Sequence, residues 1–219
     1  ASLEMLEIAE AVIIGEHEDV DSLTQQALDN GTSALEIMDD GLIAGMGIVG
    51  IKFREDFIFV PEVLVCARAM KAGMAHIEPI LSASGAMTQE TVVMGTVKGD
   101  LHDIGKNLCI MMLRGAGLTV IDLGVDTAPE DFVNAVKETE AVVIGMSALL
   151  TTTMPNMERT IEVFRDVGLR SEVGIMVGGA PVTEEYAKSI GADAYGKDAT
   201  ACVEAAKGLA ATQHSKSAT

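Results

Sequence analysis

The chain has 219 residues and a formal net charge of −18, because 33 acidic residues outnumber 15 basic ones. It is 48% apolar but only 3% aromatic, a composition typical of a globular protein rather than a disordered one. The acidity argues against a nucleic-acid surface and against an anionic membrane face, since both require clustered lysine and arginine.

The cysteines and the N-terminal residues indicate the cellular compartment. Cys66, Cys109 and Cys202 are far apart and form no CxxC pair, so they are expected to be reduced core residues. The N-terminus lacks the basic-then-apolar order of a secretory signal, and no apolar run reaches the roughly 20 residues of a membrane helix. We therefore expect a cytoplasmic protein with no membrane partner.

Residues 1–86 carry the apolar periodicity of helices. Apolar residues recur at spacings of three and four in four stretches, at about residues 6–13, 20–28, 32–53 and 61–83. Thr32 and Pro61 are typical start signals, and Gly15, Gly31 and Gly85 are typical stops. This pattern predicts an N-terminal four-helix bundle.

Residues 87–211 alternate between strand and helix patterns. Short β-branched or apolar runs occur at about residues 91–97, 118–123, 141–147, 174–177 and 192–195, with helical patterns at 105–116, 129–138, 154–167, 183–190 and 199–210. This alternation predicts an α/β domain with a five-stranded parallel sheet of the flavodoxin or Rossmann-like type. The polar tail, residues 212–219, is expected to be disordered.

The loop after the first predicted strand carries the first candidate site. Its spacing matches neither GxGxxG nor GxxxxGK[ST], so it is not a nucleotide loop. Asp100 lies two residues before His102, and Gly105 follows three residues later. A neutral imidazole can bind a metal through one nitrogen while the other donates to a carboxylate. On the loop alone, an exposed histidine that merely bonds an aspartate explains the pattern equally well.

Two further motifs follow at fixed distances. Residues 106–146, which number 41, separate Gly105 from a Ser-x-Leu sequence at Ser147 and Leu149. Another 28 residues, 150–177, lie between Leu149 and the pair Gly178-Gly179. The order and distances of Asp-x-His-x-x-Gly, Ser-x-Leu and Gly-Gly resemble the cobalamin-binding signature of base-off, His-on B12 proteins.

The resemblance extends over residues 1–210. These residues resemble the paired helical-cap and B12-binding modules of methionine synthase. The resemblance to the free-standing corrinoid proteins of methylamine, methanol, glycine betaine and methoxyaromatic methyltransferase systems is stronger. Residues 59–63 and 67–71 are similar to the family's segment at the fourth cap helix. The implied architecture is a helical cap in residues 1–86 and a cobalamin-binding domain in residues 87–211.

The resemblance implies a methyl carrier rather than a stand-alone catalyst. Such a protein accepts a methyl group on Co(I) of a bound corrinoid from a donor-specific methyltransferase. It then passes the group as methyl-Co(III) to a second, tetrahydrofolate- or thiol-dependent methyltransferase. The resemblance also allows a reductive activator as a further partner. The methyl donor is not indicated by the chain itself.

The resemblance also assigns roles to matching residues around the cobalt. His102 would be the lower axial ligand of cobalt, Asp100 would hold its other nitrogen, and Thr153 would extend that pair. The remaining loop residues expected to contact the cofactor are Gly99, Leu101, Asp103, Ile104 and Gly105.

Further residues are matched to the cofactor's tail and edges. Those expected to line or border the channel for the nucleotide tail are Ser147, Leu149, Thr151, Gly178, Gly179 and Ala180. Asp198 and Ala199 would contact the corrin edge. In the cap, Phe53 and Val60 would shield the upper face, where Val60 replaces a family leucine, and Asp39 would approach the cofactor.

Several alternatives stay open at this point. Ser147 could cap a helix, Gly178-Gly179 could form only a tight turn, and Phe53 and Val60 could be plain core residues. Two other function classes share the B12 motifs, namely a cobalamin-dependent sensor or regulator and the small subunit of a mutase. The regulators carry a basic DNA-binding module, for which this acidic chain has no candidate segment.

Overall fold

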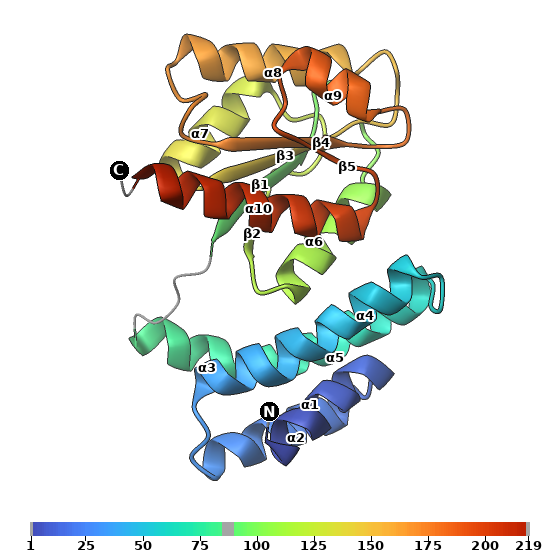
Figure 1. Cartoon of the computed structure of the whole chain (residues 1–219), viewed down its shortest axis with the longest axis vertical. Helices are drawn as coiled ribbons and strands as arrows, with labels where there is room; N and C mark the ends of the chain where they lie inside the picture. The colour runs from blue at the N-terminus through green and yellow to red at the C-terminus, as the bar shows by residue number, and fades with distance from the viewer. Residues whose placement is uncertain (1, 85–89, 218–219) are drawn as a thin grey trace. The chain divides into compact units, whose positions relative to one another are not determined.

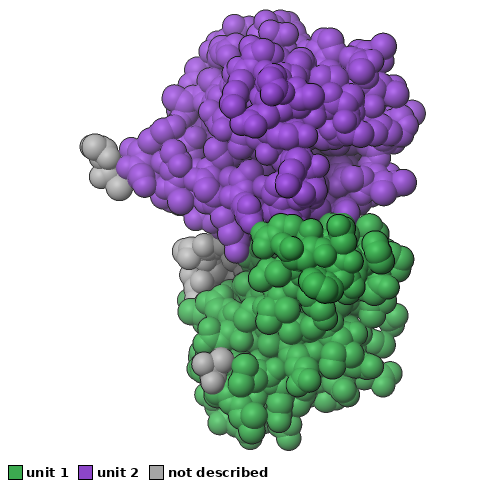
Figure 2. Space-filling view, turned by 45° about the vertical axis from the view of Figure 1, so that its right-hand side comes forward, with its two compact units in different colours: residues 1–89, 115–117 green, residues 90–114, 118–219 purple. Residues whose placement is uncertain are grey.

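The computed structural model of the chain describes residues 2–84 and 90–217. The chain forms two compact units (Figure 2). We call residues 1–89 with 115–117 the helical unit, and residues 90–114 with 118–219 the sheet unit. The boundary that the sequence predicts near residue 87, and the stop signal at Gly85, lie outside the described residues.

Two of the expected helix signals, Gly15 and Pro61, lie at helix ends in the helical unit. Its elements are α1 (Leu3–Ile14), α2 (His17–Asp29), α3 (Ala34–Glu36), the π-helix η1 (Ile37–Ile43), α4 (Ala44–Arg54) and α5 (Val60–Ser84) (Figure 1). Ser33 instead of Thr32 caps α3, and Asn30 instead of Gly31 follows α2. The Ser2 hydroxyl accepts a hydrogen bond from the Met5 N–H at the start of α1, which ends at Gly15 in the left-handed conformation. Because α3, η1 and α4 follow one another directly, the third predicted helix is one continuous segment with a π-helical centre.

The helical unit has an apolar core drawn from all of its long helices. Its fully buried members include Met5, Val12, Val20, Ile37, Leu42, Val49, Val63 and Ile77. Burial of each such side chain contributes about 1.5–3 kcal/mol. The predicted helical bundle is therefore confirmed. The described helices include none that is both long enough and apolar enough to cross a membrane.

The sheet unit contains, within its described residues, a five-stranded parallel sheet. Its strands are β1 (Thr91–Thr96), β2 (Thr119–Asp122), β3 (Val143–Ser147), β4 (Gly174–Gly178) and β5 (Ala194–Gly196). Their order is β2-β1-β3-β4-β5, and each neighbouring pair is parallel. The chain moves outward in one direction from β1 to β2 and in the other from β3 to β5. The predicted doubly wound α/β fold is confirmed.

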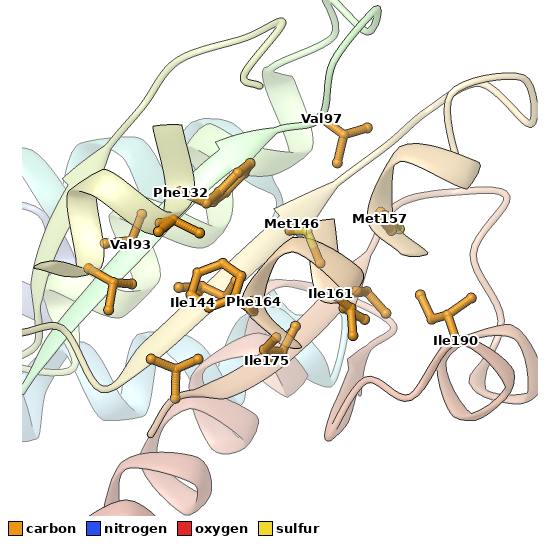
Figure 3. Close-up of a cluster of buried hydrophobic side chains, with 14 of the residues drawn as sticks. Val93, Val97, Phe132, Ile144, Met146, Met157, Ile161, Phe164, Ile175 and Ile190 are labelled. Carbon is orange, nitrogen blue, oxygen red and sulfur yellow. The ribbon is translucent and has the colours of Figure 1, made fainter. Parts of the chain in front are cut away.

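Helices cover both faces of this sheet (Figure 1). They are α6 (Ile104–Gly115), α7 (Pro129–Thr139), α8 (Pro155–Asp166), α9 (Glu184–Ile190) and α10 (Ala199–Ser217). One face packs on α7, α8 and α9, and Figure 3 shows its core around Phe132, Phe164, Ile144 and Ile175. The other face packs on α6 and α10 through residues such as Leu113 and Ala206. Since both faces are covered, the central strands are apolar on both sides.

The C-terminal residues differ from the expectation of disorder. Residues 212–217 continue α10, which ends at Ser217. Gln213 is buried, and Nε2 of His214 lies 2.6 Å from Oε2 of Glu90 at the start of β1. The polar composition misled the prediction, because a helix already formed and packed adds further residues at little cost.

Candidate functional site

The candidate loop lies at the point where the strand order reverses, between β1 and β3. It joins β1 to α6, and its strand is flanked by β2 on one side and β3 on the other. In doubly wound sheets, ligands bind at the carboxyl ends of the strands beside such a reversal. The fold therefore brings the loop after β1 close to the loop after β3, as the hydrogen bonds below show.

Asp100 and His102 form a hydrogen-bonded pair in this loop. Nδ1 of His102 lies 2.7 Å from Oδ1 of Asp100, and the His102 backbone N–H donates to the same oxygen at 3.1 Å. The Asp100 side chain is 0% exposed, whereas the His102 side chain is 50% exposed. The carboxylate is thus a fixed internal support, and the imidazole projects from it toward the surface.

The second oxygen of Asp100 is bound by the loop after β3. Oδ2 accepts hydrogen bonds from the Leu149 N–H at 2.8 Å, the Leu150 N–H at 3.1 Å and the Thr153 hydroxyl at 2.7 Å. Burial alone would raise the pKa of Asp100. The bonds from Thr153, Leu149 and His102 outweigh burial and hold this pKa well below its usual range.

This arrangement determines the tautomer of the neutral imidazole. An ionised carboxylate can only accept hydrogen bonds, so Nδ1 of His102 carries the ring proton of the neutral side chain. The other nitrogen of this half-exposed ring, Nε2, then has the free lone pair that a metal ligand needs. The pair predicted from the sequence has the geometry of a supported histidine ligand.

Two apolar side chains flank His102 at the surface. Leu101 is 71% exposed and Ile104 is 83% exposed. Isolated exposed apolar residues are common, but these two precede and follow His102 within three residues of the sequence. The loop therefore offers an accessible imidazole together with exposed apolar surface, which suits a ligand that is itself largely apolar.

A buried lysine in the helix that follows the loop forms an ion pair that the sequence did not reveal. Lys106 is 1% exposed, and its Nζ lies 2.6 Å from Oδ1 of Asp122 at the end of β2 and 2.8 Å from Oδ1 of Asn107. Asn107 in turn donates to the Asp103 carboxylate at 3.1 Å. Burial raises the pKa of Asp122, but the bonds from Lys106 and the Gly124 N–H lower it overall.

The backbones at the ends of β3, β4 and β5 approach closely. Ser147 pairs with Gly178 and Gly178 with Gly196. A Cβ at Gly178 would lie 2.7 Å from the Gly196 carbonyl oxygen, and one at Gly179, whose φ is 125°, would collide with the Ala148 carbonyl oxygen. Packing therefore requires both glycines, and the backbone conformation additionally requires glycine at position 179.

Other expected tail and edge residues lie in the same sheet unit. Ser147 does not cap a helix, because α8 begins eight residues later at Pro155. Leu149, Thr151 and Ala180 are exposed beyond the ends of β3 and β4. Asp198 caps α10, since its carboxylate accepts the Ala201 N–H at 2.7 Å, and the adjacent Ala199 is buried.

The expected cap residues belong to the helical unit. Phe53 is half-buried near the end of α4, and Val60 is exposed at the start of α5. Asp39 is exposed on the π-helix η1, a type of element found often at functional sites. Their roles toward a cofactor stay predictions.

Sequence reasoning missed the residues that hold the loop in place. Besides Lys106, these are the backbone donors of Leu149 and Leu150, Asp126, which binds the loop backbone, and Asn156, whose amide donates to the Lys98 carbonyl at 2.7 Å. An aspartate following a strand in a short turn was the available signal for Asp126. Within the described ranges, no group of three or more His, Cys, Asp and Glu side chains could hold a bare metal ion.

Comparison with known proteins identifies a family and several relatives of this chain. Two family models, each described as a B12 binding domain, match residues 90–206 and residues 6–78. The chain is 42% identical over 203 residues to dimethylamine corrinoid protein 3 of Methanosarcina acetivorans, covering 93% of this chain and 95% of that one. It is 44% identical over 189 residues to trimethylamine corrinoid protein 2 of Methanosarcina mazei, covering 84% and 87%.

A solved structure is similar over nearly the whole chain. It belongs to the methanol:cobalamin methyltransferase complex of Methanosarcina barkeri, with a TM-score of 0.84 and 30% identity. The match covers 98% of this chain and 84% of that chain.

Proposed function

This chain belongs to the family of B12-binding corrinoid proteins, and from that premise we propose that it is a methyl carrier between two methyltransferases. The observation that carries the proposal is the Asp100–His102 pair, which presents one imidazole nitrogen at the carboxyl edge of the sheet. The printed names of the relatives, dimethylamine and trimethylamine corrinoid proteins, make methylated amines the first donors to test.

The residues present fit a corrinoid better than a bare metal ion. A bare ion needs several protein ligands, whereas the cobalt of a corrin takes four nitrogens from the ring and needs one from the protein. His102 supplies one such nitrogen, and the described part of the chain offers no multidentate cluster. Exposed Leu101 and Ile104 supply apolar surface for the ring face beside it.

The chain's own residues then have distinct tasks. His102 would bind cobalt through Nε2, and the corrinoid, when bound, supplies the cobalt centre that accepts and releases the methyl group. Asp100 keeps the Nδ1 proton on the ring and fixes its orientation, because its carboxylate stays ionised at neutral pH. Thr153 and the Leu149 N–H hold that carboxylate in place.

The small residues beyond β3 and β4 would accept the displaced nucleotide tail. In this proposal the residues that would hold the tail are Ser147, Leu149, Thr151, Gly178, Gly179 and Ala180. The register pair Ser147 and Gly178 supports the assignment, because it puts both motifs at one place on the sheet edge. Phe53, Val60 and Asp39 would act from the helical unit, and Asp198 and Ala199 from the start of α10.

Reconstitution with cobalamin tests the cofactor and its ligand together. The full chain, labelled with ¹⁵N-histidine and loaded with hydroxocobalamin, is reduced to the Co(II) state for electron paramagnetic resonance. Coordination by His102 gives a doublet splitting from ¹⁵N, whereas the cofactor's own base gives a ¹⁴N triplet. His102→Ala should lose the doublet, and His214→Ala, an exposed histidine of the same unit, should keep it.

Each contrary result has a separate meaning. Failure of the wild-type chain to take up cobalamin would defeat the cofactor assignment. A triplet in the labelled wild-type chain would defeat the assignment of His102. The carrier role is tested by reducing the loaded chain to the Co(I) state with a chemical reductant and adding a methylated amine with its methyltransferase. Absorbance follows methylation of the cobalt, and the demethylated amine is the second product.

A further inference from the structure

Asp126 holds an unusual backbone conformation beside the candidate loop. It lies four residues after the end of β2, with φ of 54°, in the left-handed region that residues other than glycine seldom occupy. Such a conformation is unfavourable, and it persists where neighbouring contacts enforce it. The contacts of Asp126 show which neighbours do so.

Both the side chain and the backbone of Asp126 bind the loop after β1. Its Oδ1 accepts the Gly99 N–H at 2.7 Å, and its own N–H donates to the Asp100 carbonyl at 2.9 Å. Oδ2 also lies 3.1 Å from Nζ of Lys98, but that ion pair is exposed and contributes little. The two bonds to the backbone therefore carry the contact.

These bonds complete the support of Asp100. Its carboxylate is held by the loop after β3, through Thr153, Leu149 and Leu150. Its backbone is held by the loop after β2, through Asp126. The residue that orients the imidazole is thus fixed from both neighbouring strands.

We propose that Asp126 is a positioning residue for the His102 ligand, acting by holding the Gly99–Asp100 backbone in place. The inference rests on the proposed function, because it gives Asp126 a role in cobalt coordination. A residue that merely stabilised a turn would affect folding but leave the coordination of a folded chain unchanged.

Two substitutions separate the side chain from the backbone. Asp126→Gly removes the carboxylate, while glycine adopts the left-handed conformation without strain and keeps the N–H. Asp126→Asn keeps an acceptor for the Gly99 N–H, and asparagine tolerates this conformation. Asn forms the weaker, uncharged bond, so its effect should lie between those of Asp and Gly.

Amide hydrogen exchange of the cofactor-free chain, followed by NMR, gives the first readout. The Gly99 amide should exchange about tenfold faster in Asp126→Gly, as expected for loss of a hydrogen bond to a charged group. It should exchange about threefold faster in Asp126→Asn. If Asp126→Gly fails to fold, the comparison of Asp126→Asn with the wild type decides.

The second readout is the ¹⁵N-histidine doublet after loading with cobalamin. Asp126→Gly should lose a substantial part of the doublet at an unchanged cobalamin content, and Asp126→Asn should retain most of it. A full doublet in the glycine variant would overturn the proposal, whether or not the Gly99 amide exchanges faster. A wild-type chain without any doublet would instead overturn the function on which it rests, so the two failures are distinguishable.

Discussion

The hydroxyl of Thr153 donates a 2.7 Å hydrogen bond to Oδ2 of Asp100, across 53 residues of sequence. Both residues are buried. Through this bond, the loop after β3 supports the residue that orients His102 in the loop after β1. The two loops are therefore one structural site, and the residues that tie them together should be sensitive to substitution.

Thr153→Val should destabilise the sheet unit while conserving volume. The variant removes a hydrogen bond to a buried carboxylate, and the expected loss in free energy of unfolding is about 1–3 kcal/mol. Thr152→Val is the matched control, because Thr152 is exposed and its substitution should cost about 0.5 kcal/mol or less. Urea denaturation measures both. Equal losses would show that the Thr153 bond contributes nothing to stability.

The same bond should appear in the acid dependence of stability. The pKa of Asp100 is lowered in the folded chain relative to about 3.9 when unfolded. Its stabilising contribution is therefore complete above the unfolded pKa. It is lost as the pH falls toward the folded pKa, because only the unfolded state takes up the proton.

This group alone gives a slope of up to about 1.4 kcal/mol per pH unit. Thr153→Val removes one of the bonds that lower the pKa, so its slope should flatten at a higher pH than that of Thr152→Val as the pH falls toward the folded pKa. Urea denaturation between about pH 4 and pH 2 shows where each slope flattens. Identical slopes would contradict the assigned cause of the low pKa.

The fold and the central pair could be predicted because they depend on short-range patterns. Asp100 and His102 are two residues apart, so their contact follows from the local sequence. Ser147 and Gly178 end adjacent parallel strands, and the alternation of strands and helices places such ends at one edge of the sheet.

The supports of the pair could not be predicted, for physical reasons. The N–H groups of Leu149 and Leu150 are backbone donors, which carry no residue signature. Lys106 is charged, and charged residues are rarely buried without a partner that only the tertiary structure reveals. The turn residue Asp126 had a local signal, but its bonds to the Gly99–Asp100 backbone join loops that are distant in the sequence.

Gly179→Ala should be far more damaging than alanine at an open glycine. Gly179 combines a φ of 125° with a Cβ position that collides with the Ala148 carbonyl, whereas Gly168, at φ 76°, has no neighbouring atom within 4 Å. Gly168→Ala should cost about 1–2 kcal/mol from the backbone alone. Gly179→Ala should cost about 3 kcal/mol or more. Thermal and urea unfolding measure the difference, and equal costs would show that the loops after β3 and β4 separate freely.

The Lys106–Asp122 pair should respond unequally to loss of either partner. The Lys106 side chain is 1% exposed and the Asp122 side chain is 36% exposed. Asp122→Asn leaves a buried ammonium without its counter-charge, for which the expected loss is about 3–5 kcal/mol. Lys106→Met fills the same space with an apolar side chain and leaves a carboxylate that water reaches.

The loss for Lys106→Met should therefore be smaller, about 1 kcal/mol. Urea denaturation at neutral pH compares the free energies of unfolding of the two variants. The double variant tests whether the two substitutions are coupled. Since the lysine would no longer be stranded, adding Lys106→Met to Asp122→Asn should restore much of the lost stability. A double variant no more stable than Asp122→Asn alone would contradict the view that the buried ammonium, and not the lost ion pair, causes the damage.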